Sequence, residues 1–375
     1  MNLRVERAEL WHVRMRLVSP FETSFGVEHD REAVILRLRA DGIEGWGECV
    51  AGAFPGYSYE TVGTAWHVLQ DFFLPAVIRR PMGSAADLRS ALAASKGHPL
   101  ARAGIELALW DLFGKASGMS LKEMLGGERS SVPVGVSIGI QADAPTLVEV
   151  AAAYLRDGYR RLKLKIRPGR DVEDVRAVRK AFPEVALQVD ANSAYDREQA
   201  RSLQALDDFG LLLVEQPLAE DDLLDHAWLQ ARMRTPLCLD ESILSERHAR
   251  QALDVGACGV INIKPARLGG LTEAVRVHDL CRSRGVPVWC GGMLETGIGR
   301  AANLALASLP GFTLPGDISA SARYYAHDIA EPTFALNADS TIDVPAGAGL
   351  GVEVQLDSLE RVAVRRAVVP GATAR

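Results

Sequence analysis

The sequence lacks the cysteine pattern of a secreted or zinc-binding protein. Its five cysteines are odd in number, and no two of them form a Cys-x-x-Cys pair. This spacing argues against a disulfide framework and a zinc site, so a reducing cytoplasm is the expected location. The eight histidines include no His-Glu-x-x-His motif, the helical zinc-binding signature of metalloproteases.

Long apolar runs and blocks of one charge are also missing. No stretch approaches the roughly 18 uninterrupted apolar residues of a spanning helix, and the charged start, Arg4 to Glu9, argues against a secretory signal. The 42 basic and 48 acidic residues give a net charge of −6 without a Lys/Arg block. We therefore expect no nucleic-acid partner and no membrane partner. At 375 residues the chain is long enough for two or three domains, at about 150 residues each.

The first third of the chain is expected to form an α+β domain, residues 1–127. Residues 8–17, 33–39 and 43–49 alternate as strands, and Asp41-Gly42 is a hairpin turn before the third. A loop is predicted at 19–26, and an aromatic, glycine-rich loop at 51–59. From Glu60 the periodicity becomes helical, most clearly over 100–115, with Gly118 as a terminator.

From residue 132 the pattern changes to short apolar strands that alternate with helices such as 144–157 and 172–182. Eight repeats of this alternation favour a closed parallel barrel with helices outside. An open doubly wound sheet is the alternative, although no Gly-x-Gly-x-x-Gly turn follows the first strand. The predicted strands are 134–138, 161–166, 186–190, 211–215, 237–240, 259–264, 286–290 and 312–315.

Charged residues stand where several of these strands end. Lys165, Asp190, Glu215, Asp240 and Lys264 follow one another at intervals of 25, 25, 25 and 24 residues. A repeat of one strand–helix unit places them all at the carboxyl-terminal rim, where barrel active sites lie. Side chains two apart share a face of a strand, so Lys163 and Lys165 point together into the barrel mouth.

The charge pattern predicts a metal-assisted reaction on a carboxylate. Three adjacent acids, Asp190, Glu215 and Asp240, repel one another unless a cation neutralises them, and oxygen ligands suit Mg²⁺ or a similar ion such as Mn²⁺. Lysines on the second and sixth strands of an eight-stranded ring face each other. A lysine close to a cation can have its pKa lowered enough to remove a proton next to a bound carboxylate.

These residues and their neighbours resemble the enolase superfamily in its muconate-lactonizing subgroup. The similarity runs over nearly the whole chain and is closest to the o-succinylbenzoate synthase / N-succinylamino acid racemase family. The strings that carry it are Phe21–Gly26, Val136–Ile140, Lys163-x-Lys165, Asp190-x-Asn192, Glu215-Gln216-Pro217, Asp240-Glu241-Ser242, Asn262–Gly270, Val288–Met293 and Leu314–Ser321.

The resemblance implies a modified (β/α)7β barrel, residues 128–318, beneath an α+β capping domain to which the C-terminal segment, 319–375, returns. It implies a lyase that dehydrates 2-succinyl-6-hydroxy-2,4-cyclohexadiene-1-carboxylate to o-succinylbenzoate, on the way to menaquinone. It also implies an isomerase activity, the racemisation of N-succinyl or other N-acylamino acids. The substrate is then a small carboxylate, and the enzyme a cytoplasmic homo-oligomer.

By the same resemblance, Asp190, Glu215 and Asp240 are the metal ligands, and Lys165 and Lys264 are the acid–base pair on opposite faces. In dehydration Lys165 removes the proton and returns it to the leaving hydroxide, while Lys264 stabilises the anion; Lys163 orients the substrate or tunes Lys165. Glu241 is expected to support the site. Arg267 either tunes the site or forms a surface ion pair. The implied substrate contacts are Phe25, Ser137, Lys163, Asn192, Gly291, Gly292, Met293 and Leu294.

Two further features have alternative explanations. Gly291 and Gly292 either bring backbone N–H groups close to a carboxylate or form a tight turn. The start of the helix near Gly297 either attracts an anion or is packed.

Four other functions are open or disfavoured. A dedicated N-acylamino acid racemase and a muconate cycloisomerase-like enzyme share the lysine layout. A catalytically silent carboxylate-binding barrel predicts the loss of a lysine or an acid, and none is missing. Dipeptide epimerases are disfavoured because Asp317 is a single acid where they carry a pair.

Overall fold

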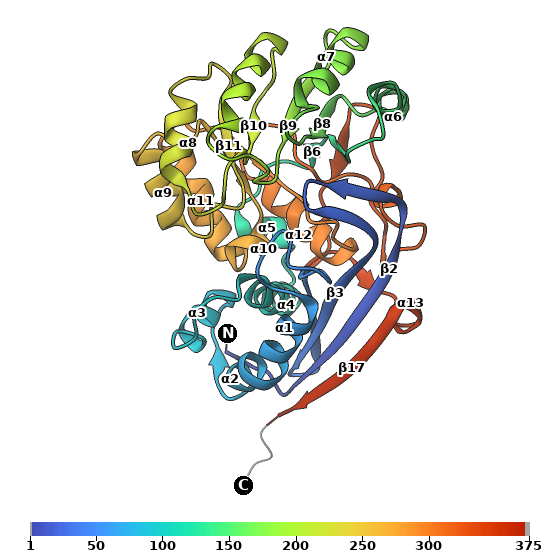
Figure 1. The fold of residues 1–375 in the computed structure, drawn as a ribbon. Coiled ribbons are helices and arrows are strands. Elements are labelled where there is room, and N and C mark those ends of the chain that lie inside the picture. The colour runs from blue at the N-terminus through green and yellow to red at the C-terminus, as the bar shows by residue number, and fades with distance from the viewer. Residues whose placement is uncertain (1, 372–375) are drawn as a thin grey trace.

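The structure is a computed structural model that describes residues 2–371. It has two parts, a barrel with outer helices and a smaller α+β cap packed against one side of it (Figure 1). Residue 1 of the expected first domain and residues 372–375 of the expected C-terminal segment lie outside the described part of the chain.

The cap is built on a four-stranded antiparallel sheet in the order β17-β2-β3-β4. The Asp41-Gly42 turn between β3 and β4 is confirmed, because both residues have positive φ, 51° and 78°, as a two-residue hairpin of this type requires. The C-terminal strand β17 pairs antiparallel with β2 along the edge of the sheet (Figure 1). The strands span β2 Arg7–Thr23, β3 Gly26–Ala40, β4 Ile43–Cys49 and β17 Ala363–Pro370.

The predicted loop at 19–26 is wrong for most of its length. β2 continues to Thr23 and β3 begins at Gly26, so only Ser24 and Phe25 form the turn at the hairpin tip. The register shifts between Arg16 and Phe21, next to Pro20, and this irregularity interrupts the alternation that marks a strand in the sequence.

One long helix, α4 (Pro99–Ser117), packs on the cap sheet, and it ends at Gly118 with φ 71°, as predicted. Glycine is required where helix and sheet meet, since a Cβ on Gly47 would lie 2.1 Å from the carbonyl oxygen of Gly104. The smaller elements of the cap are β1 Leu3–Arg4, α1 Val62–Val68, α2 Leu74–Ile78, β5 Pro81–Met82 and α3 Leu88–Ala91.

The barrel is a parallel sheet of seven strands in sequence order, β7 to β13. The strands are β7 Val136–Ile138, β8 Arg161–Lys165, β9 Ala186–Asp190, β10 Val214–Glu215, β11 Leu237–Leu239, β12 Val260–Ile263 and β13 Val288–Cys290. The helical segments between and after them are α6 Ala144–Arg156, α7 Asp171–Ala181, η3 Gln199–Phe209, α8 Leu223–Gln230, α9 Glu246–Asp254, α10 Pro265–Leu268, α11 Leu271–Ser283 and α12 Gly297–Ala307.

The eighth predicted strand, 312–315, is not a continuous strand. Single parallel bridges join Phe312 to Val288 and Gly316 to Val134, so this segment closes the ring between β13 and the chain before β7. Pro315 has no N–H to donate, which limits the segment to isolated bridges. The fold is therefore the modified (β/α)7β type with a cap, as expected.

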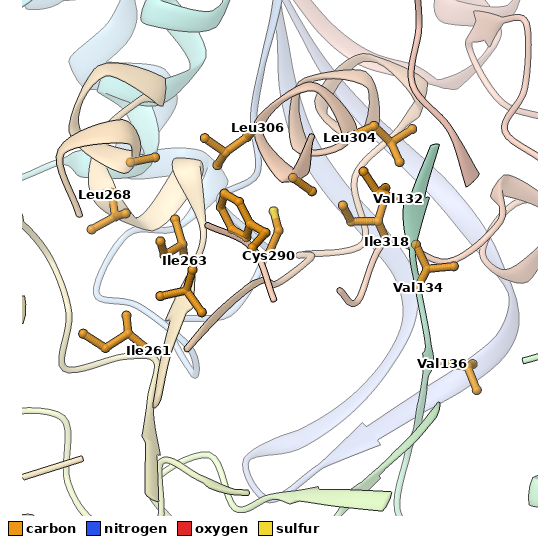
Figure 2. Packing of buried hydrophobic residues seen from close by; sticks show 14 of the residues in the cluster. Val132, Val134, Val136, Ile261, Ile263, Leu268, Cys290, Leu304, Leu306 and Ile318 are labelled. Atoms are coloured by element: carbon orange, nitrogen blue, oxygen red, sulfur yellow. The ribbon is translucent and has the colours of Figure 1, made fainter. Parts of the chain in front are cut away.

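Apolar side chains that point outward from the strands pack under the helices. Leu162 and Leu164 are fully buried in the main core cluster together with Val175 and Val178 of α7, so the predicted outward face of β8 is confirmed. Figure 2 shows part of the same core, where Ile261 and Ile263 of β12 lie near Leu268, and Cys290 near Leu306.

The remaining segments connect the two parts. They are α5 Leu121–Leu125, β6 Ser131–Pro133, η4 Ser321–Arg323, β14 Ala330–Glu331, β15 Thr341–Asp343, β16 Glu353–Val354 and α13 Leu356–Val362. Within residues 2–371, none of the helices has the length and apolar character needed to span a bilayer.

Candidate active site

The predicted charged residues lie side by side at the carboxyl ends of the barrel strands. Lys165 of β8 is in register with Asp190 of β9, and Asp190 with Glu215 of β10. Asp240 follows the last residue of β11, and Lys264 follows the last residue of β12. The regular spacing in the sequence therefore corresponds to one level of the barrel, because each repeat returns the chain to the same rim.

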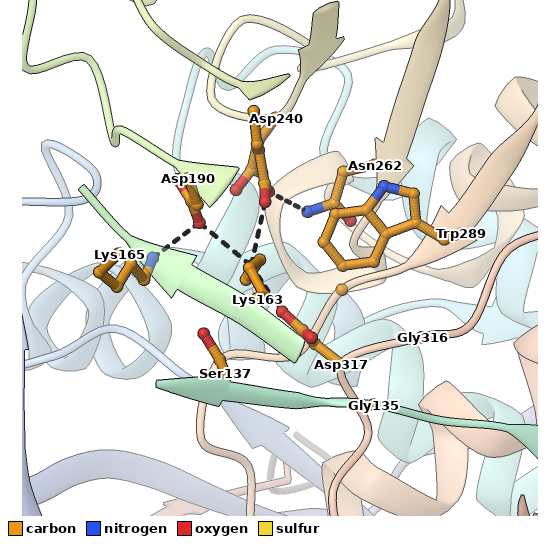
Figure 3. Close-up of polar contacts among 12 residues, drawn as sticks. Gly135, Ser137, Lys163, Lys165, Asp190, Asp240, Asn262, Trp289, Gly316 and Asp317 are labelled. Atoms are coloured by element: carbon orange, nitrogen blue, oxygen red, sulfur yellow. Dashed lines mark hydrogen bonds and ion pairs between the residues drawn. The ribbon is translucent and has the colours of Figure 1, made fainter. Parts of the chain in front are cut away.

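Both lysines of β8 point into the barrel mouth and bind acids (Figure 3). The Nζ of Lys163 lies 3.0 Å from carboxylate oxygens of both Asp190 and Glu215 and 2.5 Å from Oδ2 of Asp317. The Nζ of Lys165 lies 2.7 Å from Oδ2 of Asp190 and donates to Oδ1 of Asn192 at 2.5 Å.

Lys264 approaches the acids from the other side. Strands β9, β10 and β11 separate β8 from β12 in the sheet. The Nζ of Lys264 lies 2.6 Å from Oδ2 of Asp240, and the other oxygen of Asp240 accepts a hydrogen bond from the hydroxyl of Tyr57 at 2.9 Å. Lys165 and Lys264 are thus bound to different acids at two ends of the row.

The close ion pairs control which acids are charged. Burial raises the pKa of Asp190, but Lys165 and Lys163 outweigh it and hold the pKa below its usual value. Burial and the neighbouring Asp190 raise the pKa of Glu215 well above its usual value. For Lys264 burial lowers the pKa, but the Asp240 carboxylate raises it more. The pKa of Lys264 is therefore raised, whereas a base beside a cation is expected to have a lowered pKa. The cause is the Asp240 carboxylate, which attracts the proton of Lys264. A cation bound to Asp240 would oppose that attraction.

The acids fit a hard divalent cation by their chemistry. They offer only oxygen ligands, they stand on adjacent strands, and Asp190 and Asp240 both raise the pKa of Glu215 by repulsion. Their oxygens are bound by ammonium groups and by Asn262 Nδ2, which lies 2.7 Å from Oε1 of Glu215. With the side chains in these positions, no group of three His, Cys, Asp or Glu residues within 2–371 surrounds a point where a metal ion could bind.

A cavity of about 100 Å³ lies over this charged centre. The hydroxyl of Ser137 is buried there without a protein partner, so one polar group of the wall is free to bind a ligand. Among the residues predicted for the site, those that line the cavity are Phe25, Ser137, Lys163, Lys165, Asn192, Lys264, Gly292, Met293 and Leu294.

Glycine is needed at position 291 for a reason other than binding a carboxylate through its N–H. Its N–H donates to the carbonyl of Ile263 at 3.1 Å, and it does not line the cavity, so this N–H is not available to a carboxylate. A Cβ at this position would lie 2.4 Å from Oδ1 of Asn262 and 2.7 Å from Cε of Lys264. Glycine is therefore required by the close approach of two site residues.

Arg267 and Glu241 lie behind the charged centre. Arg267 is buried, pairs with Oδ1 of Asp240 and donates to the carbonyl of Ile243 at 2.7 Å, so its interpretation as a surface ion pair is wrong. Glu241 accepts from Nδ2 of Asn192 at 3.0 Å, and burial and Asp240 raise its pKa to about 8.

The start of α12 does bind an acidic side chain, and that side chain belongs to the protein. The carboxylate of Glu48, from β4 of the cap, accepts from the N–H of Thr296 at 3.0 Å and of Gly299 at 2.9 Å. This helix start is therefore a contact between the two parts of the molecule.

Sequence reasoning missed several residues of the site. Arg161 donates to Oδ1 of Asp317 at 2.6 Å, and Asp317 also binds Lys163. A signal existed for Arg161, because it stands two residues before Lys163 on the same face of β8. Arg31, Glu28 and Tyr324 also line the cavity, and no local pattern marks them.

The fold and the site together define a barrel enzyme with an acidic row between two lysines at the carboxyl-terminal rim. Comparison with known families identifies the class. The family description "Mandelate racemase / muconate lactonizing enzyme, N-terminal domain" matches residues 7–126, and "Enolase C-terminal domain-like" matches residues 146–358. The chain belongs to the enolase superfamily, and membership implies dependence on a divalent metal ion in general.

Relatives of two activities cover almost the whole chain. An o-succinylbenzoate synthase of Geobacillus kaustophilus is 49% identical over 362 residues, 96% of each chain. An N-succinylamino acid racemase of Amycolatopsis sp. is 52% identical over 361 residues, 96% of this chain and 98% of the relative. A crystal structure of an enolase superfamily member from Listeria innocua superposes with a TM-score of 0.94 at 40% identity, covering 98% of this chain and 99% of that one. The expected family is confirmed, and the enzymes in it act on small carboxylates.

Proposed function

We propose that this enzyme is an o-succinylbenzoate synthase, which dehydrates 2-succinyl-6-hydroxy-2,4-cyclohexadiene-1-carboxylate in menaquinone biosynthesis, and that it also racemises N-succinylamino acids. The observation that carries the proposal is the placement of Lys165 and Lys264 at two ends of one acidic row. Both reactions need a proton to be moved next to a carboxylate, and relatives with each activity are about half identical to this chain.

Asp190, Glu215 and Asp240 are the proposed ligands of Mg²⁺, or of another divalent ion such as Mn²⁺. Their oxygen-only chemistry and mutual repulsion support this assignment. When bound, the ion supplies positive charge that stabilises negative charge developing on the substrate carboxylate.

The two lysines move the protons. In dehydration Lys165 takes the proton next to the carboxylate, the bond from carbon to the hydroxyl oxygen breaks, and Lys165 returns the proton to the leaving hydroxide to form water. The ammonium group of Lys264 stabilises the developing anion from the opposite side. In racemisation one lysine removes the proton and the other delivers one to the opposite face.

The remaining residues hold the substrate and the lysines. Lys163, bound to three acids, stabilises their charges and orients the substrate carboxylate together with Ser137. Asn192 and Glu241 hold Lys165 through a chain of hydrogen bonds, and Arg267 holds Asp240. Phe25, Gly292, Met293 and Leu294 form the cavity wall and exclude water.

We further propose a cytoplasmic homo-oligomer without nucleic-acid or membrane partners, with domain limits at 1–127, 128–318 and 319–375. The five cysteines are buried as free thiols, which is consistent with a reducing compartment. Sedimentation equilibrium tests the oligomeric state.

The decisive experiment is a comparison of kcat/KM for dehydration and for racemisation with purified enzyme and Mg²⁺. We expect both activities. Racemisation alone indicates a dedicated N-acylamino acid racemase, and turnover of a muconate alone indicates a cycloisomerase. Binding of N-succinylamino acids without turnover or exchange of their α-proton with deuterated solvent indicates a silent carboxylate-binding barrel.

A further inference from the structure

One side chain of the cap reaches the reacting groups of the barrel. Tyr57 belongs to the segment 51–60 between β4 and α1, and its hydroxyl donates to Oδ1 of Asp240 at 2.9 Å. The Nζ of Lys264 lies 4.5 Å from the centre of the Tyr57 ring, within the range of a cation–π contact. Tyr57 therefore touches both members of the Asp240–Lys264 ion pair.

The segment that carries Tyr57 is held at two places. A Cβ on Gly56 would lie 2.4 Å from Cδ2 of Phe25, so the backbone there packs directly on the ring at the tip of the β2–β3 hairpin. At its end, the carboxylate of Glu60 accepts from the N–H of Leu100 at 2.7 Å and of Ala101 at 3.0 Å, which anchors it to α4. These contacts place the Tyr57 ring within the barrel mouth.

The cap contacts the second lysine less closely. Lys165 is bound by Asp190 and by Asn192, both from the barrel. Its contact with the cap is the ring of Phe21 in β2, whose centre lies 5.9 Å from its Nζ, near the outer limit of a cation–π contact. Within residues 2–371, Tyr57 is the only side chain of the 51–60 segment that lines the cavity over the charged centre. The cap thus contacts Lys264 more closely than it contacts Lys165.

We propose that Tyr57 is a positioning residue for Lys264: its ring holds the ammonium group and its hydroxyl fixes the Asp240 carboxylate that the ammonium group binds. The role rests on the proposed function, in which Lys264 serves one face of the substrate. It assigns the cap a larger part in proton transfer on that face than on the other.

The test compares the two enantiomers of an N-succinylamino acid in deuterated water with Mg²⁺. Lys165→Ala and Lys264→Ala first identify which enantiomer each lysine deprotonates, since each variant keeps exchange at one face. In Tyr57→Leu we expect exchange of the Lys264-dependent enantiomer to fall ~10-fold, with exchange of the other enantiomer and KM nearly unchanged. Tyr57→Phe keeps the ring and is expected to restore most of the loss.

Tyr59→Leu is the matched control, because Tyr59 lies in the same segment but is 59% exposed and does not line the cavity. It is expected to leave both exchange rates unchanged. An equal fall for both enantiomers in Tyr57→Leu, or no fall in a folded variant, overturns the positioning role while the proposed function stands. A wild-type enzyme that neither dehydrates nor exchanges overturns the proposed function and the positioning role together.

Discussion

Two sets of buried acids in this molecule have different partners. In the active site Asp190 and Asp240 lie 2.6–2.7 Å from a lysine ammonium group, and their pKa values are held below the usual range. In and around the cap, Glu48, Glu60 and Glu106 are bound by backbone N–H groups at the starts of α12, α4 and α11. Burial raises the pKa of each of these three glutamates to about 7.

The comparison shows that burial alone does not decide whether an acid is charged. A helix start provides about half a positive charge, which reduces the cost of burying a carboxylate without removing it. For Asp190 and Asp240, a lysine ammonium group in direct contact supplies a full positive charge, and this outweighs the cost of burying the carboxylate. The first set is therefore suited to hold charge for chemistry. In the second set Glu48 and Glu106 join the cap to the barrel, and Glu60 joins two segments of the cap.

The largest expected effect comes from removing the cation that the first set is proposed to hold. Chelation with EDTA is expected to abolish dehydration and racemisation, because the repelling acids lose their divalent counter-charge. Added Mg²⁺ or Mn²⁺ should restore both rates, which a steady-state assay measures. Full activity after exhaustive chelation, with no metal in elemental analysis, would contradict the metal assignment.

Replacement of either opposed lysine is expected to be nearly as damaging. Lys165→Ala and Lys264→Ala should each lower kcat for both reactions by about 10²–10⁴-fold, the range of acid–base catalysis. Circular dichroism checks that the variants fold, and Lys180→Ala, near the end of α7, is a control that changes a lysine outside the site. Full racemisation by Lys264→Ala would show that two bases are not needed.

In the second set, Glu48→Ala is expected to lower the free energy of unfolding by about 3 kcal/mol, because buried donors at Thr296 and Gly299 lose their acceptor. Glu48→Gln keeps an acceptor of the same shape and should lose much less. Urea denaturation of the two variants measures the difference. Equal losses would mean that the hydrogen bonds to α12 contribute little.

The smallest expected effect is a pH dependence that distinguishes the two sets. The folded pKa of Glu106, about 7, is above the unfolded value of 4.5. Its protonation stabilises the fold fully below pH 4.5, and this contribution is lost as the pH rises through 7. Glu106→Gln lacks the group, so its stability relative to the wild type should rise by about 1 kcal/mol or more between pH 5 and pH 8.

Urea denaturation of both proteins at several pH values checks the sign. A constant difference between Glu106→Gln and the wild type from pH 5 to pH 8 would show that Glu106 does not titrate in this range.

The sequence predicts the positions of the active-site acids better than those of the acids bound by helix starts. The active-site acids and lysines follow strands at a fixed repeat, so their common level could be predicted before any contact was known. Glu48 and Glu106 carry no such signal, because their partners lie 248 and 166 residues away. The apolar run at 312–315 predicts a continuous strand, but the folded segment pairs only through isolated bridges at Phe312 and Gly316.

By itself the sequence determined the inward and outward faces of β8, the turn at Asp41-Gly42, and the row of charges at the rim, since these depend on local geometry and on the length of one repeat. Only the tertiary structure decided which ammonium group meets which carboxylate, that Gly291 must clear Asn262, and that Tyr57 reaches Asp240 across 183 residues. The physical reason is that hydrogen bonds and ion pairs act over a few ångströms, and the folding of the whole chain decides which distant residues come within that range.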